Sequence, residues 1–146
     1  MIYGMPNMPV ERWQQNIQTA LNFNIPHISC YALTVEPKTA LQKLIQKGTI
    51  SEPSDELAQQ HFQVLKNTLE SKGFVHYELS NFGKQGFFSV NNSNYWKGKK
   101  YLGIGPSAHS FNGHERSWNV SNNQLYMKGI QQNQLPSEKE ILTLIC

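Results

Sequence analysis

Alternation between apolar strands and amphipathic helices over residues 1–80 limits the folds open to this chain more than any other feature of its sequence. Met1–Gly4 has the composition of a buried strand, and His27–Val35 is a nearly continuous apolar run, typical of a parallel strand covered on both faces. Phe74–Leu79 predicts a third strand. Strands separated by helices are typical of parallel βα units, so the sequence predicts an α/β fold.

Apolar residues recur at helical spacing between these strands. The periodicity predicts helices over 9–23 and 55–72, packed on one side of the strands, and a shorter helix from Leu41 that Gly48 ends. Ser54 or Asp55 is expected to cap the second long helix. Three strands and three helices in this order indicate a parallel βα series. Because the series begins within a strand, we expect it to be a slice of a larger barrel.

The composition changes after residue 80. Residues 81–121 are rich in Asn, Gly, Ser and aromatics, which predicts loops with short strands at Tyr101–Ile104 and Ala108–Phe111. A helix is predicted over Asn122–Gln132, and a second from Ser137, with Glu140 in a capping box, running to Cys146. The predicted domains are therefore a βα segment (1–80), a loop-rich segment that closes the barrel (81–121) and a helical segment (122–146).

Composition argues against several classes of protein. A net charge of +3 gives no broad basic surface, so we expect no nucleic-acid partner. No apolar run approaches the roughly 20 residues that span a bilayer, and the residues after Met1 do not resemble a signal peptide. Two cysteines, Cys30 and Cys146, do not suggest a disulfide framework, so a reducing, cytoplasmic location is expected.

Few side chains carry a recognisable chemical pattern. No histidine stands at a known metal-ligand spacing, and His61 and His76 are expected to be structural, His61 on a helix surface. His109 lies in the irregular segment GIGPSAHS, where it either serves a function or only bonds to the backbone. Tyr95 and Trp96 belong to an aromatic cluster that either stacks on a flat ligand or covers the open end of a barrel. Cys30 is expected to be a core residue.

Four strings of the sequence resemble, in order, the motifs of one family. They are IYGMP at 2–6, HISCYALTVEPKTAL at 27–41, YELSNFGKQG at 77–86 and NSNYWKGKKYLGIGPSAHS at 92–110. All four are similar to the radical S-adenosylmethionine (SAM) family of oxygen-independent coproporphyrinogen III oxidases, and most similar to its haem-chaperone branch. The resemblance implies a partial TIM-like barrel, a [4Fe-4S] cluster, SAM, and haem or porphyrin chemistry.

The same resemblance assigns site residues. It places Ile2 and Thr34 on the SAM side, and Asn92, Tyr95 and Trp96 in the haem motif. If the chain binds haem or porphyrin, we expect His109 to lie on that side as well, since its Gly- and Pro-rich loop follows the Tyr95–Trp96 aromatics. Asn91 stands where the haem-chaperone branch has a histidine. The family's C-x-x-x-C-x-x-C cluster motif is absent from this sequence. We therefore expect the chain alone to lack the cluster, to hold no cofactor firmly and to be inactive.

Three hypotheses about function remain. The chain is part of a radical SAM haem chaperone or oxidase-like oxidoreductase and inactive by itself, or it is a non-catalytic module that binds haem or porphyrin, or it is a structural remnant of a truncated gene. In each case exposed barrel edges predict self-association.

Overall fold

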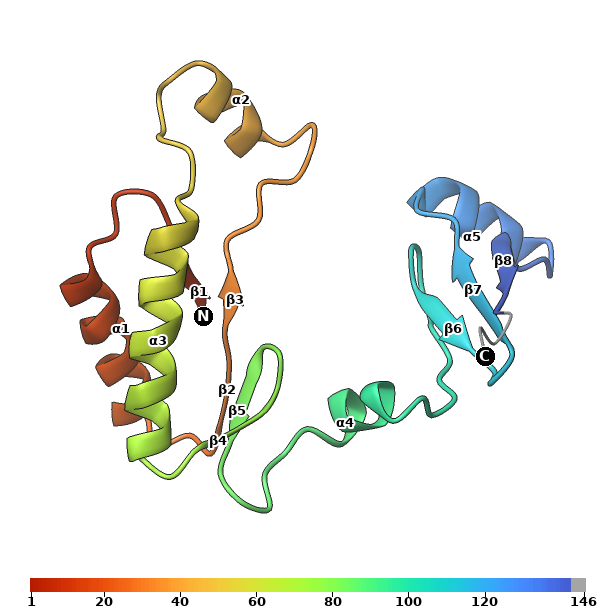
Figure 1. Ribbon diagram of the computed structural model, residues 1–146. Helices are drawn as coiled ribbons and strands as arrows, with labels where there is room; N and C mark the ends of the chain where they lie inside the picture. The colour runs from red at the N-terminus through yellow and green to blue at the C-terminus, as the bar shows by residue number, and fades with distance from the viewer. Residues whose placement is uncertain (143–146) are drawn as a thin grey trace. The chain divides into compact units, whose positions relative to one another are not determined.

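The computed structural model describes residues 1–142, and the chain divides into two compact units, Met1–Ser89 and Val90–Cys146 (Figure 1). Each unit has helices and strands of its own. The division into a βα segment (1–80), a barrel-closing segment (81–121) and a helical segment (122–146) describes roles within a barrel and stays a prediction.

The helices predicted for the first unit are all present. They are α1 (Val10–Asn22), α2 (Ala40–Gln46) and α3 (Asp55–Ser71). Ser54 is the N-cap of α3, and its hydroxyl accepts a hydrogen bond from the Leu57 N–H at 3.2 Å. Gly48 and Gly73 follow α2 and α3 with φ of +69° and +79°, the left-handed conformation in which helices commonly end.

The core of the first unit forms where α1 and α3 pack against each other and against the strands (Figure 1). Trp13 and Ile17 of α1 are 1% exposed, and Leu65 of α3 is completely buried. The Trp13 indole N–H donates to the His61 carbonyl at 2.9 Å, so the largest core residue also has its polar atom satisfied. Cys30 is buried in this core, which confirms its predicted role.

The strands of this unit form two small sheets. β1 (Ile2–Tyr3) pairs in parallel with β3 (Tyr31–Ala32), as the βα interpretation predicts. β2 (His27–Ser29) precedes β3 by one residue and pairs antiparallel with β5 (Asn81–Gly83), which also pairs antiparallel with β4 (Val75–Glu78). The long predicted strand 27–35 is therefore shorter, and its two halves join different partners.

β2 and β4 run in the same direction, as predicted, because each of them is antiparallel to β5. They are not neighbours in the sheet, because β5, which was not predicted, lies between them. The chain turns back within two residues after β4, so β5 runs antiparallel to β4 and separates it from β2. Phe82 of β5 is fully buried, and Asn81 accepts a hydrogen bond from the Ser29 hydroxyl and donates to Glu78. Asparagine is more common in loops than in strands, so this segment did not resemble a strand. In the structure, the hydrogen bonds of the Asn81 side chain compensate for its burial.

The second unit is built on an antiparallel sheet in the order β6–β7–β8 (Figure 1). Its elements are α4 (Val90–Trp96), β6 (His109–Phe111), β7 (Glu115–Asn119), α5 (Asn123–Gln131) and β8 (Ser137–Ile141). The predicted helix 122–132 is present as α5, with Asn122 as N-cap. A strand near 108–111 was predicted correctly, whereas near Tyr101 only an isolated bridge to Phe111 forms.

Two predictions for this unit were wrong. Residues 90–96 form the short helix α4 where a loop was predicted, and the segment from Ser137 is a strand, so the capping box at Glu140 does not form. β8 pairs along its whole length with β7, and Lys139 makes an ion pair with Glu115 at 2.9 Å. Pairing with a distant strand therefore outweighs the local helix propensity of Glu and Lys. The rest of the predicted helix, including Cys146, lies outside the described residues.

Among residues 1–142, no helix is both long enough and apolar enough to cross a membrane.

Candidate functional site

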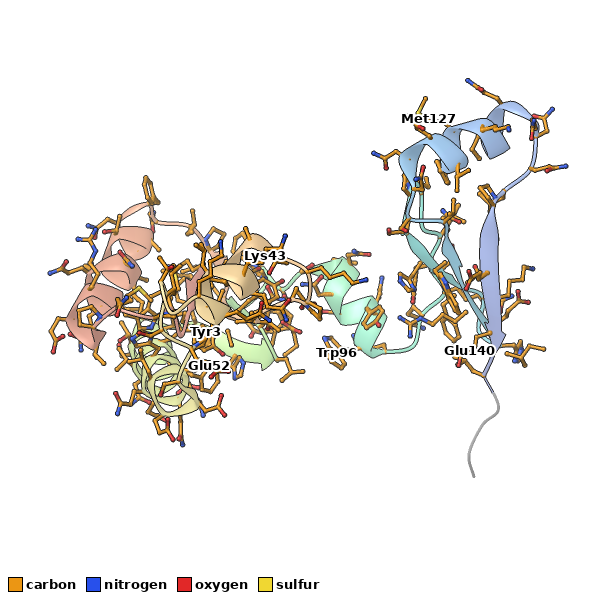
Figure 2. All side chains as sticks on the ribbon, turned by 90° about the horizontal axis from the view of Figure 1, so that it is seen from above. Tyr3, Lys43, Glu52, Trp96, Met127 and Glu140 are labelled. Carbon is orange, nitrogen blue, oxygen red and sulfur yellow. The ribbon has the colours of Figure 1, made fainter. Side chains whose placement is uncertain are left out.

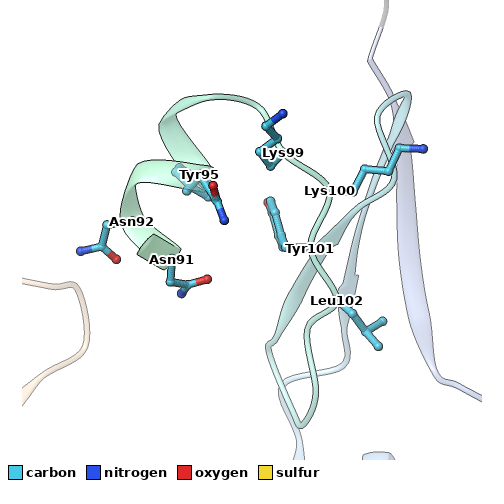
Figure 3. A pocket seen from close by; sticks show the side chains of 8 residues that line it. Asn91, Asn92, Tyr95, Lys99, Lys100, Tyr101 and Leu102 are labelled. Atoms are coloured by element: carbon cyan, nitrogen blue, oxygen red, sulfur yellow. The ribbon is translucent and has the colours of Figure 1, made fainter. Parts of the chain in front are cut away.

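Helix α4 and the chain that follows it enclose a cavity of about 270 Å³ (Figure 3). Its walls are residues 91, 92, 94 and 95 of α4 and residues 99–102 of the next segment. Gly98, with φ of +62°, turns the chain back at the end of α4. Its N–H donates to the Tyr95 carbonyl at 3.0 Å. This reversal brings Tyr101 opposite Tyr95.

Aromatic rings dominate one wall of this cavity. The Tyr95 and Tyr101 ring centroids lie 5.6 Å apart, and the Trp96 ring meets Tyr95 edge-on at 6.0 Å. Trp96 is 56% exposed and projects from α4 (Figure 2), but it does not line the cavity. The other walls carry the Asn91 and Asn92 amides and Lys99, so the cavity combines flat apolar surfaces with hydrogen-bond donors.

His109 lies apart from that cavity, at the start of β6. Its ring is exposed and lies 6.1 Å from the ring of Trp118, its partner across the sheet. The backbone around it is closely packed, because a Cβ on Gly103 would come within 2.1 Å of the His109 carbonyl oxygen. The structure thus places Asn92 and Tyr95 together and His109 elsewhere in the unit.

Buried polar contacts hold the GIGPSAHS loop in place. Asn119 is 4% exposed, and its side-chain amide donates to the Gly105 carbonyl at 2.9 Å. The Gly105 N–H donates to the Tyr126 hydroxyl at 3.2 Å, and the Gly103 N–H donates to the Ser110 hydroxyl at 2.9 Å. The loop is therefore a fixed platform that presents the His109 ring to solvent.

A second cavity of about 230 Å³ lies on the β6–β7 side of the same tyrosine pair. Phe111 and Arg116, which are register partners, line it together with Tyr95, Tyr101, Gly98 and Leu142. Arg116 was not singled out in the sequence, because an isolated arginine carries no pattern. Only its place beside aromatic residues from other elements marks it as a site residue.

The chain is similar to known proteins of one group. No family model matches the chain. The chain is 34% identical over 136 residues to the heme chaperone HemW of Bacillus subtilis (strain 168), covering 93% of this chain and 36% of that protein. It is 40% identical over 109 residues to radical S-adenosyl methionine domain-containing protein 1, mitochondrial, of Mus musculus, covering 75% of this chain and 25% of that protein.

A solved structure shows a similar fold. It is that of coproporphyrinogen III oxidase (HemN) from Escherichia coli, a radical SAM enzyme, with a TM-score of 0.75 and 19% sequence identity over 97% of this chain and 36% of that one. This chain belongs to the HemN/HemW-like radical SAM family. It spans about a quarter to a third of the length of the curated relatives that it matches.

The two residues predicted to lie on the SAM side, Ile2 and Thr34, are found in β1 and just after β3. Ile2 is 51% exposed and stands in register with Tyr31, which is 52% exposed, so both side chains are open to contact. Thr34 is exposed two residues beyond the end of β3. Ile2 offers an apolar surface suited to a flat base, and Thr34 offers a hydroxyl near the same strand ends.

Cys30, the cysteine within residues 1–142, does not have the environment of an iron–sulfur ligand. Burial raises the pKa of Cys30 to about 11, although the nearby N-terminal amino group partly opposes this shift. A cluster needs thiolates, and Cys30 is a neutral thiol within a hydrophobic core. Within residues 1–142, no group of three His, Cys, Asp or Glu side chains is arranged to hold a metal ion.

Burial of His61 corrects one further expectation. His61 was predicted on the helix surface, but it is fully buried between Trp13 and β1, and its Nδ1 accepts a hydrogen bond from the Gly4 N–H at 3.0 Å. Burial lowers the pKa of His61, so the ring is neutral at pH 7. It joins the IYGMP strand to α3 and is structural, as predicted.

Proposed function

We propose that this chain is part of a radical SAM protein of the haem-chaperone type, and that its second unit binds haem or porphyrin. In this proposal Met1–Ser89 supplies βα units of a partial TIM-like barrel. The observation that carries the proposal is the aromatic pair Tyr95 and Tyr101, which lines both cavities of this unit, because Tyr95 lies in the segment that resembles the family's haem motif. Relatives named as heme chaperones match over 93% of the chain.

In the same proposal the chain is inactive alone. The [4Fe-4S] cluster and SAM supply radical chemistry in this family, and the cluster ligands would have to come from elsewhere, since Cys30 is unsuited to that role. Ile2 and Thr34 are proposed to contact SAM from the strand ends, which is where ligands of barrel proteins bind. We retain the cytoplasm as the proposed compartment, since Cys30 is a free thiol.

Haem binding is proposed to use His109 as the iron ligand. Imidazole is a common ligand of haem iron, whereas the Asn91 amide, which lines the cavity where the branch has histidine, is a poor one. His109 is exposed at a firmly held strand end, with Trp118 beside its ring, so a macrocycle has an aromatic surface to lie against.

A haem titration of four forms tests this proposal: wild type, His109→Ala, Asn91→His and His114→Ala. The last is the control, because His114 is an exposed histidine in the turn between β6 and β7. We expect His109→Ala to weaken binding about tenfold and to abolish the shifted Soret band. Asn91→His should strengthen binding by about tenfold, and His114→Ala should match wild type.

Equal affinities and equal spectra for all four forms would mean nonspecific binding and would refute the haem-binding role. The related hypothesis of a non-catalytic haem or porphyrin module is favoured by the aromatic wall at Tyr95 and Tyr101, which lies within this chain. Tight haem binding by the isolated chain would support the hypothesis of a separate haem-binding module. Haem binding only within a longer protein would support the hypothesis that the chain is part of a radical SAM chaperone.

A further inference from the structure

Arg116 carries a positive charge, and one of its N–H groups is buried without a hydrogen-bond acceptor among residues 1–142. Its Nε is buried and makes no hydrogen bond within the described residues. Glu140 lies opposite it on β8 but is exposed (Figure 2), and the ion pair recorded in residues 1–142 joins Lys139 to Glu115 instead. A buried guanidinium N–H that makes no hydrogen bond is unfavourable, and a carboxylate relieves this through charge-assisted hydrogen bonds.

The surroundings of Arg116 are aromatic. Rings of Tyr95, Tyr101 and Phe111 line the same cavity, with the Tyr101 and Phe111 centroids 6.1 Å apart and the Tyr95 and Tyr101 centroids 5.6 Å apart. A cavity of about 230 Å³ is smaller than the roughly 300–1,000 Å³ typical of complete ligand sites. It therefore suits one edge of a larger flat molecule, with a carboxylate at that edge.

His109 lies on the same face of the sheet as Arg116. His109 and Phe111 are two residues apart on β6, and their register partners Trp118 and Arg116 are two apart on β7, so all four side chains point to one face. Diagonal neighbours of this kind have Cα atoms about 7–8 Å apart. This spacing is comparable with the reach from the iron of a haem to a carboxylate on its propionate chains.

We propose that Arg116 binds a carboxylate of the porphyrin while Tyr95, Tyr101 and Phe111 contact the adjoining ring edge. The proposal rests on the proposed haem or porphyrin function and specifies the ligand as a carboxylate-bearing macrocycle with a fixed orientation. Its propionate edge lies over the Phe111–Arg116 row, and its centre lies over the His109–Trp118 row.

The test uses the full chain and three probes: haem, haem dimethyl ester and metal-free protoporphyrin IX. The variants are Arg116→Gln, Arg116→Lys, Lys99→Gln and His109→Ala. The control is Arg12→Gln, which removes the other arginine of the chain at an exposed site on α1. Circular dichroism of every variant establishes that the fold is retained.

We expect Arg116→Gln to weaken haem and protoporphyrin IX binding about tenfold or more and to leave the dimethyl ester unaffected. Arg116→Lys should show a smaller loss, because an ammonium keeps the charge but not the paired donors. His109→Ala should weaken haem alone, since protoporphyrin IX has no iron. Arg12→Gln should match wild type with all three probes.

Two results would overturn the proposal while leaving the haem-binding function intact. One is haem affinity that is equal in wild type and Arg116→Gln, with the ester binding as tightly as haem. The other is a loss confined to Lys99→Gln, which would place the carboxylate in the cavity beside α4. Absence of binding for all three probes by wild type would instead refute the proposed function, and the role of Arg116 with it.

Discussion

Replacing Gly4 by alanine is predicted to destabilise the first unit through a contact that the sequence does not reveal. Gly4 follows β1 with φ of +71°, and a Cβ built there lies 2.9 Å from the Cβ of Ala58 in the first turn of α3. Ordinary contacts between carbon atoms are about 3.5–4.0 Å, so the strand end or the helix must move. The Gly4 N–H also bonds to His61, which limits how far the strand can shift.

Two costs contribute to the expected loss. A left-handed conformation costs a residue with a Cβ about 1–2 kcal/mol. Overpacking in a tight site costs about 1–3 kcal/mol more. Gly4→Ala should therefore lower the free energy of unfolding by about 2–5 kcal/mol. Gly73→Ala is the matched control: its φ is +79°, but no atom lies within 4 Å of the added Cβ, so only the first cost applies.

Urea unfolding, followed by circular dichroism and tryptophan fluorescence, measures these differences. Ala58→Gly alone should cost about 1 kcal/mol in helix propensity. Combined with Gly4→Ala it removes the clash, so the double variant should be more stable than the sum of the two losses predicts by about 1–3 kcal/mol. Equal losses for Gly4→Ala and Gly73→Ala, or strictly additive behaviour in the double variant, would show that the 2.9 Å approach has no energetic consequence.

Three further predictions concern pH, metal content and association. Burial lowers the pKa of His61, so as the pH falls the unfolded chain binds a proton before the folded chain does. The free energy of unfolding should therefore keep its full value above about pH 6.5 and decrease below it. Urea titrations at successive pH values measure this dependence, which His61→Phe should flatten. Anaerobic reconstitution with iron and sulfide should leave no cluster on the isolated chain and no SAM cleavage; stoichiometric iron and sulfide in a monomer would contradict this. The chain should self-associate through the edge of β1, because within the described residues that strand pairs only with β3, and Ile2→Lys should reduce the mass measured by light scattering, whereas a concentration-independent monomer in wild type would count against the idea.

Much of the first unit could be predicted from local pattern. The apolar stripe with Trp13 and Ile17 indicated α1, and Ser54 followed by acidic residues indicated the start of α3, because the period of a helix and the bonding of its caps are local properties. The motif strings identified the family for the same reason, since they keep residue types at fixed intervals. In the second unit Asn122 marked the start of α5 equally well.

Pairing between distant segments was not predictable in this way. Phe82 lies in a segment of Asn, Gly and Ser that resembles a loop, yet β5 is buried because both β2 and β4 lie beside it. The segment from Ser137 has the composition of a helix start, and it is a strand because β7 offers it a partner along its whole length.

Local composition and spacing thus determined the helices, their caps and the family to which this chain belongs. Tertiary structure alone decided the insertion of β5 between β2 and β4, the burial of His61 beneath Gly4 and the gathering of Tyr95, Phe111 and Arg116 at one cavity. The physical reason is that a hydrogen bond within a helix joins residues four apart, whereas a sheet and a cavity join residues whose separation in sequence is arbitrary. Which of them meet depends on the whole of the packed unit.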